Sequence, residues 1–286
     1  MIAMQSHIHR APAVERNGGS APLREDYREV WGNMLHAMDP AALLAHHRET
    51  RSTFLECLRE LAASLPAGAS VAELGCGTAV DSALLAAEFP SLRFMAADIS
   101  PQAVAIAVKC AAAANADLAV LVADIFSLPF PNNRVDMIFS QGVMEHFADP
   151  MPSLREQARA LRHGGFIVVN VPQTFTGYTL HKKRKIAAGE WKLGWETSYS
   201  SGDLKRFGRK FGLVVERVFG CSYWPSRREP VFVLRDLARK ARRRLPRATL
   251  KFLSPALDAY DSAWRILERH AGHIFMQNIV AVYRKP

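Results

Sequence analysis

The sequence has few cysteines, and they are not arranged as metal ligands. Cys57, Cys76, Cys110 and Cys221 lie far apart and form no Cys-x-x-Cys pair. Such spacing indicates neither a zinc site nor a disulfide framework. We therefore expect free thiols, packed as small apolar side chains in a reducing compartment, and no metal centre.

The chain also lacks a long apolar run. No stretch approaches the roughly 20 residues of a membrane span, and residues 1–20 contain no apolar core of signal-peptide length. A cytoplasmic location is the expectation that follows. The 286 residues, 49% of them hydrophobic, suffice for one large domain whose core needs no disulfides.

Basic residues are unevenly distributed along the chain. The net charge is +10, yet residues 235–251 alone hold eight Lys or Arg against one acid, and residues 182–185 are four consecutive Lys or Arg. The remainder is close to neutral. This pattern excludes a protein that is basic all over, and it predicts a near-neutral domain that carries two local basic clusters.

Hydrophobic periodicity predicts an α/β fold. Residues 1–22 show no periodicity and are expected to form a flexible tail, whereas residues 23–66 have helical spacing and are expected to form a helical cap. From residue 70 onward, short apolar runs alternate with helical segments, which indicates a doubly wound, mainly parallel sheet with helices on both faces. The expected strands are 71–74, 92–97, 118–123, 135–140 and 166–171, and the expected helices are 79–89, 101–115 and 151–162.

The second half of the chain departs from this alternation. Its polar, aromatic and basic beginning is interpreted as an insertion on the substrate side, and a basic helical insertion precedes the last strand. All of these segments are expected to belong to a single domain, residues 23–286. In order, they are the insertion 173–198, a helix 201–211, a strand 213–219, the basic helical insertion 227–270 and a strand 274–283.

A glycine-rich segment, Glu73-Leu-Gly75-Cys-Gly77-Thr78, joins the first predicted strand to the next helix. Glycines allow a tight turn and a close approach of the backbone to a ligand, and the amides at a helix start face that ligand. The segment is not a dinucleotide fingerprint, because Val80 stands where the last glycine of Gly-x-Gly-x-x-Gly is required. Glu73 suits a cationic ligand better than a pyrophosphate. A purely structural turn is the alternative.

Acidic and amide side chains follow the other predicted strands. Asp98 ends the second strand, 23 residues after Gly75, where an acid can accept hydrogen bonds from ribose hydroxyls. The alternative for Asp98 is the N-cap of the helix that begins near Pro101. Because ligands of open α/β sheets bind outside the carboxyl ends of the strands, Glu73, Asp98, Asp124 and Gln141 are predicted to share one site.

This stretch resembles the motifs of class I S-adenosylmethionine (SAM)-dependent methyltransferases of the small-molecule type, and the resemblance covers about residues 61–171. It implies SAM as the cofactor and a Rossmann-like, seven-stranded sheet whose last strand is antiparallel. It places Glu73 beside the amino acid part of SAM, Asp98 beside the ribose and Asp124 beside the adenine amino group. Ala79 departs from the family, which often has a third glycine there. The implied cofactor-binding residues are Glu73, Gly75, Cys76, Gly77, Asp98, Ile99, Asp124, Ile125 and Gln141.

The sequence after the fourth predicted strand limits the acceptor. It reads Ser-Gln-Gly-Val at 140–143, which is not the Asn/Asp-Pro-Pro-aromatic tetrad of adenine and glutamine amino methylases. It also has no cysteine for cytosine C5 chemistry and no acid cluster for a catechol-type metal. We expect methylation of an oxygen or nitrogen on a small-molecule, glycan or lipid-linked acceptor. His146 is the candidate general base, and a packed or capping histidine is the alternative.

Two regions bear on how the acceptor is held. The cap and the insertion are expected to roof its pocket with aromatic side chains. The basic stretch 231–251 fits a peripheral contact with the anionic inner face of a membrane, phosphates of the acceptor, or a solvated helix, and nucleic acid is the least expected partner. Rival functions are an RNA or protein methyltransferase that docks through this helix, and a non-catalytic methyltransferase-like binding subunit. The aromatic candidates are Tyr27, Trp31, Trp191, Trp195 and Tyr199.

Overall fold

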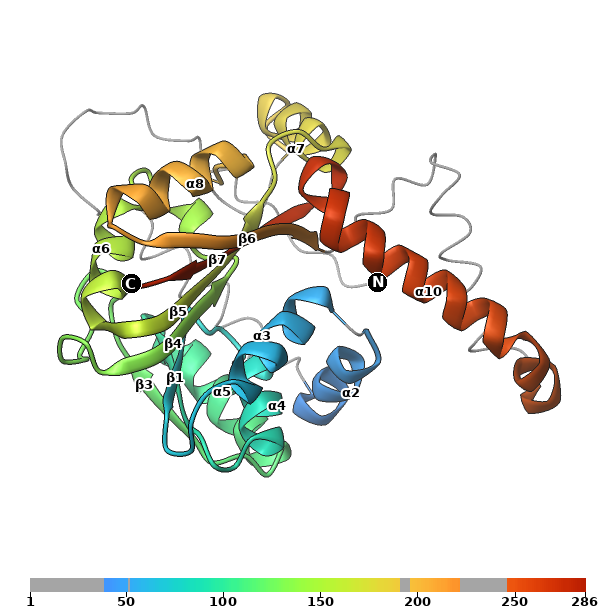
Figure 1. Ribbon diagram of the computed structural model, residues 1–286, viewed down its shortest axis with the longest axis horizontal. Helices are drawn as coiled ribbons and strands as arrows, with labels where there is room; N and C mark the ends of the chain where they lie inside the picture. Colours follow the sequence, from blue (N-terminus) through green and yellow to red (C-terminus); the bar gives the residue numbers. More distant parts are fainter. Residues whose placement is uncertain (1–38, 51, 191–195, 222–245) are drawn as a thin grey trace.

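The structure, a computed structural model, describes residues 39–50, 52–190, 196–221 and 246–286. Its strands are β1 (Ser70–Leu74), β2 (Arg93–Asp98), β3 (Leu118–Val122), β4 (Val135–Gln141), β5 (Leu161–Pro172), β6 (Val214–Cys221) and β7 (Asn278–Arg284). They form one sheet in the order β3-β2-β1-β4-β5-β7-β6 (Figure 1). β1 to β5 pair in parallel, and β7 runs antiparallel to both β5 and β6. The predicted Rossmann-like sheet with an antiparallel last strand is therefore confirmed.

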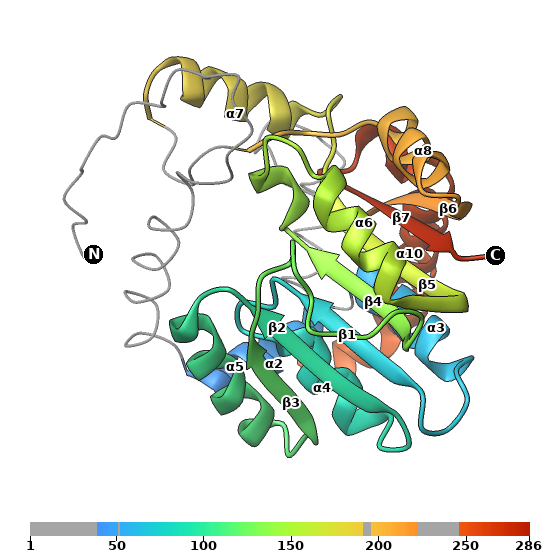
Figure 2. The same ribbon diagram turned by 90° about the vertical axis from the view of Figure 1, so that its left-hand side faces the viewer.

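Helices cover both faces of this sheet (Figures 1 and 2). They are α2 (Pro40–Thr50), α3 (Thr53–Ala63), α4 (Val80–Glu88), α5 (Pro101–Ala113), η1 (Met144–His146, a 3-10 turn), α6 (Met151–Ala160), α7 (Gly177–Ala187), α8 (Ser201–Lys210) and α10 (Arg247–Phe275). α3, α4 and α5 contribute to the core on one face, and α6 and α8 to the core on the other. α7 lies within the predicted insertion and follows the carboxyl end of β5.

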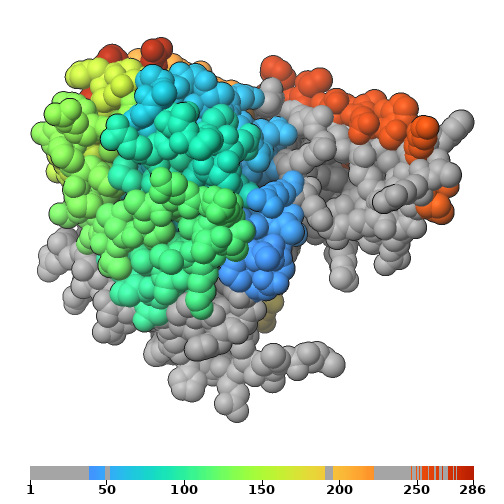
Figure 3. Space-filling model, turned by 90° about the horizontal axis from the view of Figure 1, so that it is seen from below, coloured from blue at the N-terminus to red at the C-terminus, as the bar shows by residue number. Residues whose placement is uncertain are grey.

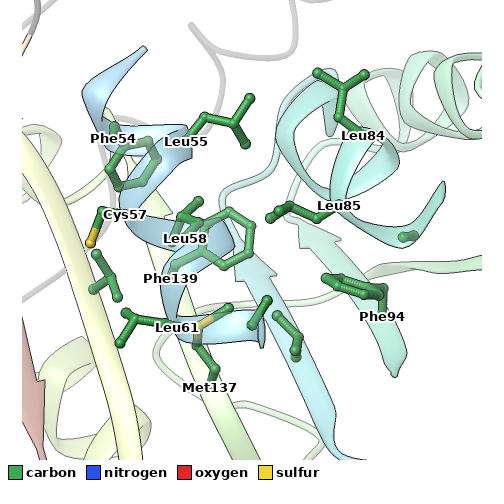
Figure 4. Close-up of a cluster of buried hydrophobic side chains, with 14 of the residues drawn as sticks. Phe54, Leu55, Cys57, Leu58, Leu61, Leu84, Leu85, Phe94, Met137 and Phe139 are labelled. Atoms are coloured by element: carbon green, nitrogen blue, oxygen red, sulfur yellow. The ribbon is translucent and has the colours of Figure 1, made fainter. Parts of the chain in front are cut away.

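The two cores follow from the alternation of side chains along each strand. Met137 and Phe139 of β4 belong to the core beneath α3 and α4, whereas Ile138 between them belongs to the core on the opposite face. Phe54 of α3 meets Phe139 edge to face, with ring centroids 6.3 Å apart (Figure 4). α3, predicted as part of a helical cap, therefore packs as a core helix on the sheet.

Among the predicted element boundaries, those next to β5 and β7 are wrong by several residues. The helix expected at 151–162 ends at Ala160, because Leu161 already belongs to β5 and pairs with Val135. The amide of Arg134 donates to the carbonyl of Ala160 at 2.8 Å, so hydrogen bonds to the neighbouring strand replace helical hydrogen bonds from this point. The last strand begins at Asn278, because Ile274 still belongs to the final turn of α10.

Helix α10 begins within the predicted basic helical insertion, ends beyond it and crosses β6 at two glycines. It extends over 29 residues and contains Pro255, and a Cβ on Gly220 would lie 2.1 Å from the backbone carbon of Gly272. Only two residues without side chains allow so close a backbone contact. Residues 231–245 of the predicted basic stretch lie outside the described part of the chain. Among the described helices, none is long and apolar enough to cross a membrane.

This crossing predicts a stability effect. Gly220→Ala forces a methyl group into the backbone of Gly272, and overpacking of this kind should lower the free energy of unfolding by about 1–3 kcal/mol, measured by urea denaturation. Gly202→Ala in α8 is the matched control, since its Cβ would meet only the Ser200 hydroxyl, at 3.6 Å. If Gly220→Ala unfolds at the same urea concentration as the wild type, the described crossing is incorrect.

Candidate functional site

The glycine-rich segment forms a tight loop between β1 and α4. Gly75 and Gly77 have φ angles of +63° and +51°, in the left-handed region that favours glycine. A Cβ on Gly75 would lie 2.5 Å from the Val143 side chain, so no larger residue fits there. The loop is thus in direct contact with the segment that follows β4.

Ala79 also has a left-handed backbone, with φ +50°, immediately before α4. A glycine in this position avoids the steric cost that Ala79 carries. Ala79 nevertheless keeps the same turn, and its side chain is fully buried. The departure from the family pattern therefore leaves the shape of the loop intact.

Glu73 lies beneath this loop, near the end of β1. Its side chain is buried, and its Oε2 accepts a hydrogen bond from the amide of Ser82 at 3.3 Å. Burial raises the pKa of Glu73 from 4.5 to about 8, and the nearby carboxylates of Asp81 and Asp98 add to the rise. A positive charge beside Glu73 lowers such a pKa, so the site favours cationic ligands.

Asp98 ties the loop to the end of β2. Its Oδ2 accepts a hydrogen bond from the Gly77 amide and its Oδ1 accepts one from the Ser100 amide, both at 2.9 Å. Burial raises the pKa of Asp98, and these backbone donors oppose the rise. The N-cap of α5 is Ser100, whose hydroxyl accepts from the amide of Ala103 at 3.3 Å. The alternative interpretation of Asp98 as that N-cap is therefore wrong.

Asp124 and Ile125 follow β3 beside Asp98. The amide of Ala123 donates to the carbonyl of Asp98 at 2.9 Å, and Oδ1 of Asp124 accepts from the amide of Phe126 at 2.9 Å. Ile125 is half-buried and packs against the core on the α6 side of the sheet. The third strand end thus adjoins the second, as the topology requires.

The remaining predicted cofactor residues lie around the same loop. Cys76 donates its amide to the carbonyl of Ala97 at 3.0 Å, and burial raises the pKa of its thiol, which stays protonated. Ile99 is half-buried between Asp98 and Ser100. Gln141 is exposed at the end of β4, next to Asn170 of β5 in the sheet register.

A buried polar cluster beyond β4 was not predicted from the sequence. Glu145 of η1 is 4% exposed, and its Oε2 has no hydrogen-bond partner among the described residues. Nearby, the side chain of Lys182 in α7 is buried, with its Nζ 3.1 Å from Oε2 of Glu196. Burial raises the pKa of Glu145 from 4.5 to about 8; Glu196 adds to the rise and Lys182 opposes it.

The sequence pattern around this cluster predicts exposed side chains and not a buried polar cluster. Lys182 is the first of four consecutive basic residues, a pattern that predicts an exposed cluster, whereas the structure buries it against Glu196. Glu145 directly precedes His146, the predicted candidate for the general base. A glutamate in the segment that follows a predicted buried strand was the available clue.

His146 is part of η1, and Tyr199 contacts the same turn. His146 is half-buried at the end of η1. Tyr199 is buried, and its hydroxyl donates to the carbonyl of Met144 at 3.1 Å, so it anchors η1. The other aromatic candidates for the acceptor pocket lie outside the described residues: Tyr27, Trp31, Trp191 and Trp195.

Burial of Glu145 predicts a pH-dependent stability. The folded protein holds a proton on Glu145 that the unfolded chain has released, so this contribution is fully present below about pH 4.5 and is lost as the pH rises through about 8. The free energy of unfolding should therefore fall between pH 6 and pH 8, and Glu145→Gln should reduce that fall by about 1–3 kcal/mol. Urea denaturation at both pH values measures the difference.

The matched control is Glu190→Gln. Glu190 is exposed, and its pKa is lowered by Lys185, so it is ionised at both pH values and the substitution should leave the fall unchanged. An equal fall in Glu145→Gln and in the wild type would contradict a protonated Glu145 in the neutral protein.

The loop, the acids at the strand ends and the sheet order define a Rossmann-like protein with a cofactor site at the carboxyl edge of its parallel strands. Comparison with known proteins specifies the family. A family model described as "Methyltransferase domain" matches residues 72–169. A trans-aconitate 2-methyltransferase from Azoarcus sp. is 30% identical over 175 residues, which cover 60% of this chain and 67% of that protein. The chain belongs to the class I SAM-dependent methyltransferases.

Other relatives match over shorter regions. A malonyl-[acyl-carrier protein] O-methyltransferase from Hahella chejuensis is 33% identical over 114 residues, and another from Herminiimonas arsenicoxydans is 31% identical over 125 residues. These matches span only 39% and 44% of the length of those two relatives. A SAM-dependent methyltransferase structure from Thermotoga maritima has a TM-score of 0.53 at 15% identity, covering 82% of this chain and 88% of that one, and shares the fold.

Proposed function

We propose that this protein transfers the methyl group of SAM to an oxygen or nitrogen of a small-molecule, glycan or lipid-linked acceptor. The observation that carries the proposal is the loop at Gly75 and Gly77, held by a buried carboxylate of Asp98. The fit to SAM rests on three further features. These are the left-handed backbone of Gly75 and Gly77, the buried Glu73 and the acids on adjacent strand ends.

Each proposed cofactor residue has a role that its position supports. Glu73 accepts the amino group of SAM, a cation that offsets the cost of the buried carboxylate. Asp98 and Asp124 accept hydrogen bonds from the ribose and the adenine amino group, and Ile125 packs on the ring. Cys76 contributes backbone rather than thiol, because its thiol stays protonated. Ile99 and Gln141 adjoin the cofactor from the ends of β2 and β4.

The acceptor is proposed to approach beside η1. SAM supplies a methyl group on a positively charged sulfur, so the transfer is a displacement with a good leaving group. Positioning alone supplies much of the rate for such a step. His146 takes the proton of a hydroxyl acceptor in this proposal. An oxygen acceptor is in keeping with the names of two relatives, the malonyl-[acyl-carrier protein] and ubiquinone biosynthesis O-methyltransferases.

Cofactor binding is the first test. Calorimetric titration of the folded protein with SAM and with S-adenosylhomocysteine should give dissociation constants in the micromolar range. Asp98→Ala removes the acceptor for the Gly77 and Ser100 amides and should abolish binding. The exposed Asp117→Ala is the matched control and should bind as the wild type does. A folded wild-type protein that binds neither compound would overturn the methyltransferase proposal and favour the non-catalytic subunit.

The role of His146 is tested by methyl transfer. A panel of carboxylic acid, phenol and amine acceptors is incubated with the protein and labelled SAM. If His146 is the base for a hydroxyl acceptor, His146→Asn should lower kcat by about 100-fold or more and leave the SAM dissociation constant unchanged. The exposed His163→Asn serves as control. If His146→Asn transfers methyl groups as fast as the wild type, His146 is a packed or capping histidine and not the base.

A further inference from the structure

Helix α7 and the residues just before it expose large apolar side chains. Phe175 is 74% exposed, Leu180 is 53% exposed and Ile186 is 45% exposed. Single exposed apolar residues are ordinary on soluble proteins, but several together, bordered by charge, mark interaction surfaces. These three lie within twelve consecutive residues.

Basic side chains accompany these apolar side chains on the same helix. Lys183 and Arg184 are exposed on α7, and neither has an ion-pair partner in the part of the chain that the structure describes. Residues 174–189 contain no Asp or Glu. The outer surface of α7 therefore combines apolar side chains with uncompensated positive charge.

The inner surface of α7 is fixed to the domain. Lys182 is buried against Glu196, and the Thr179 hydroxyl donates to the carbonyl of Gln173. The helix is capped by Thr176, whose hydroxyl accepts from the amide of Thr179 at 3.2 Å. Anchored in this way, α7 keeps a constant outer surface on the side where β5 ends (Figure 2).

We propose that the α7 surface, defined as Phe175, Leu180, Lys183 and Arg184, docks the protein on an anionic phospholipid bilayer. Apolar side chains of an interfacial helix enter the boundary between headgroups and acyl chains, and Lys or Arg beside them are attracted to anionic lipids. Both components are present on α7, and the helix itself contains no Asp or Glu. A surface for RNA needs the cations but gains nothing from exposed Leu180 and Ile186.

The docking surface refines the proposed acceptor, and in that respect it rests on the proposed function. α7 follows the carboxyl end of β5, and its Lys182 reaches into the polar cluster around Glu145. A bilayer against α7 would lie beside the acceptor side of the proposed site. The acceptor class that fits is therefore a lipid-linked or membrane-resident molecule, rather than a freely diffusing one.

Matched controls come from a surface away from α7, which Figures 1 and 3 show. Helices α2 and α5 lie at the opposite end of the molecule from α7 in Figure 1, and the surface over them is visible in Figure 3. Arg48 of α2 and Lys109 of α5 are exposed cations there. Val108 and Val214, 51% and 54% exposed, are apolar residues outside α7. Substituting these residues changes charge and hydropathy by similar amounts without altering the α7 surface.

The experiment is co-sedimentation of the full chain with vesicles. Wild-type protein should bind vesicles of phosphatidylcholine with phosphatidylserine at low salt, and bind vesicles of phosphatidylcholine alone much more weakly. The double variant Lys183→Glu/Arg184→Glu should bind at least about 30-fold more weakly, because it loses two cations near the surface and adds two anions. Phe175→Ser/Leu180→Ser should also weaken binding. The controls Arg48→Glu/Lys109→Glu and Val108→Ser/Val214→Ser should bind as the wild type does.

Three outcomes would overturn the docking proposal. They are a wild type that ignores anionic vesicles, α7 variants that bind as the wild type does, and controls that lose as much binding as the α7 variants. Competition by RNA that depends on Lys183 and Arg184 but not on Phe175 and Leu180 would assign the surface to nucleic acid instead. Calorimetry with SAM on the wild-type protein separates the two proposals. If the protein binds vesicles but not SAM, only the methyltransferase proposal is rejected. If it binds SAM but not vesicles, only the docking proposal is rejected.

Discussion

The hydrogen bond from the Gly77 amide to the carboxylate of Asp98 is the contact on which the site depends. A buried carboxylate is costly unless donors surround it, and Asp98 takes two backbone amides, one from the loop and one from the start of α5. It therefore fixes the end of β2, the loop after β1 and the next helix relative to one another. The parallel register of β1 and β2 sets the spacing that makes this possible.

The same edge of the sheet gathers buried acids that few cations offset. The side chains of Glu73, Asp81, Asp98 and Glu145 are all buried. Burial raises the pKa of Glu73 and of Glu145 to about 8, so the protein avoids the full cost of these charges by holding protons. A cation beside such a carboxyl group replaces the proton without adding net charge, so we expect this edge of the sheet to favour positively charged ligands. A sulfonium compound with an amino group has that character.

Much of this arrangement could be predicted from the sequence, because it depends on local order along the chain. The glycine spacing, the acid after each strand and the alternating apolar runs identify Glu73, Asp98 and Asp124 before any contact is known. Local patterns fail where distant segments decide the outcome. Leu161 looks like the end of a helix until Val135 pairs with it, and Lys182 looks exposed until Glu196 meets it. The roles of the cofactor residues and of His146 remain predictions.

Sheet order has a consequence for how the chain acquires its structure. Among the described strands, β6 pairs only with β7, and β7 lies between β6 and β5 in the sheet. Since β7 follows β6 by more than fifty residues, β6 has no place in the sheet until β7 has been made. During synthesis β5 therefore stays an open edge while α10 is translated. Such unpaired edges invite contact with other chains, so we expect the nascent protein to be open to aggregation and to chaperones at β5 during that period.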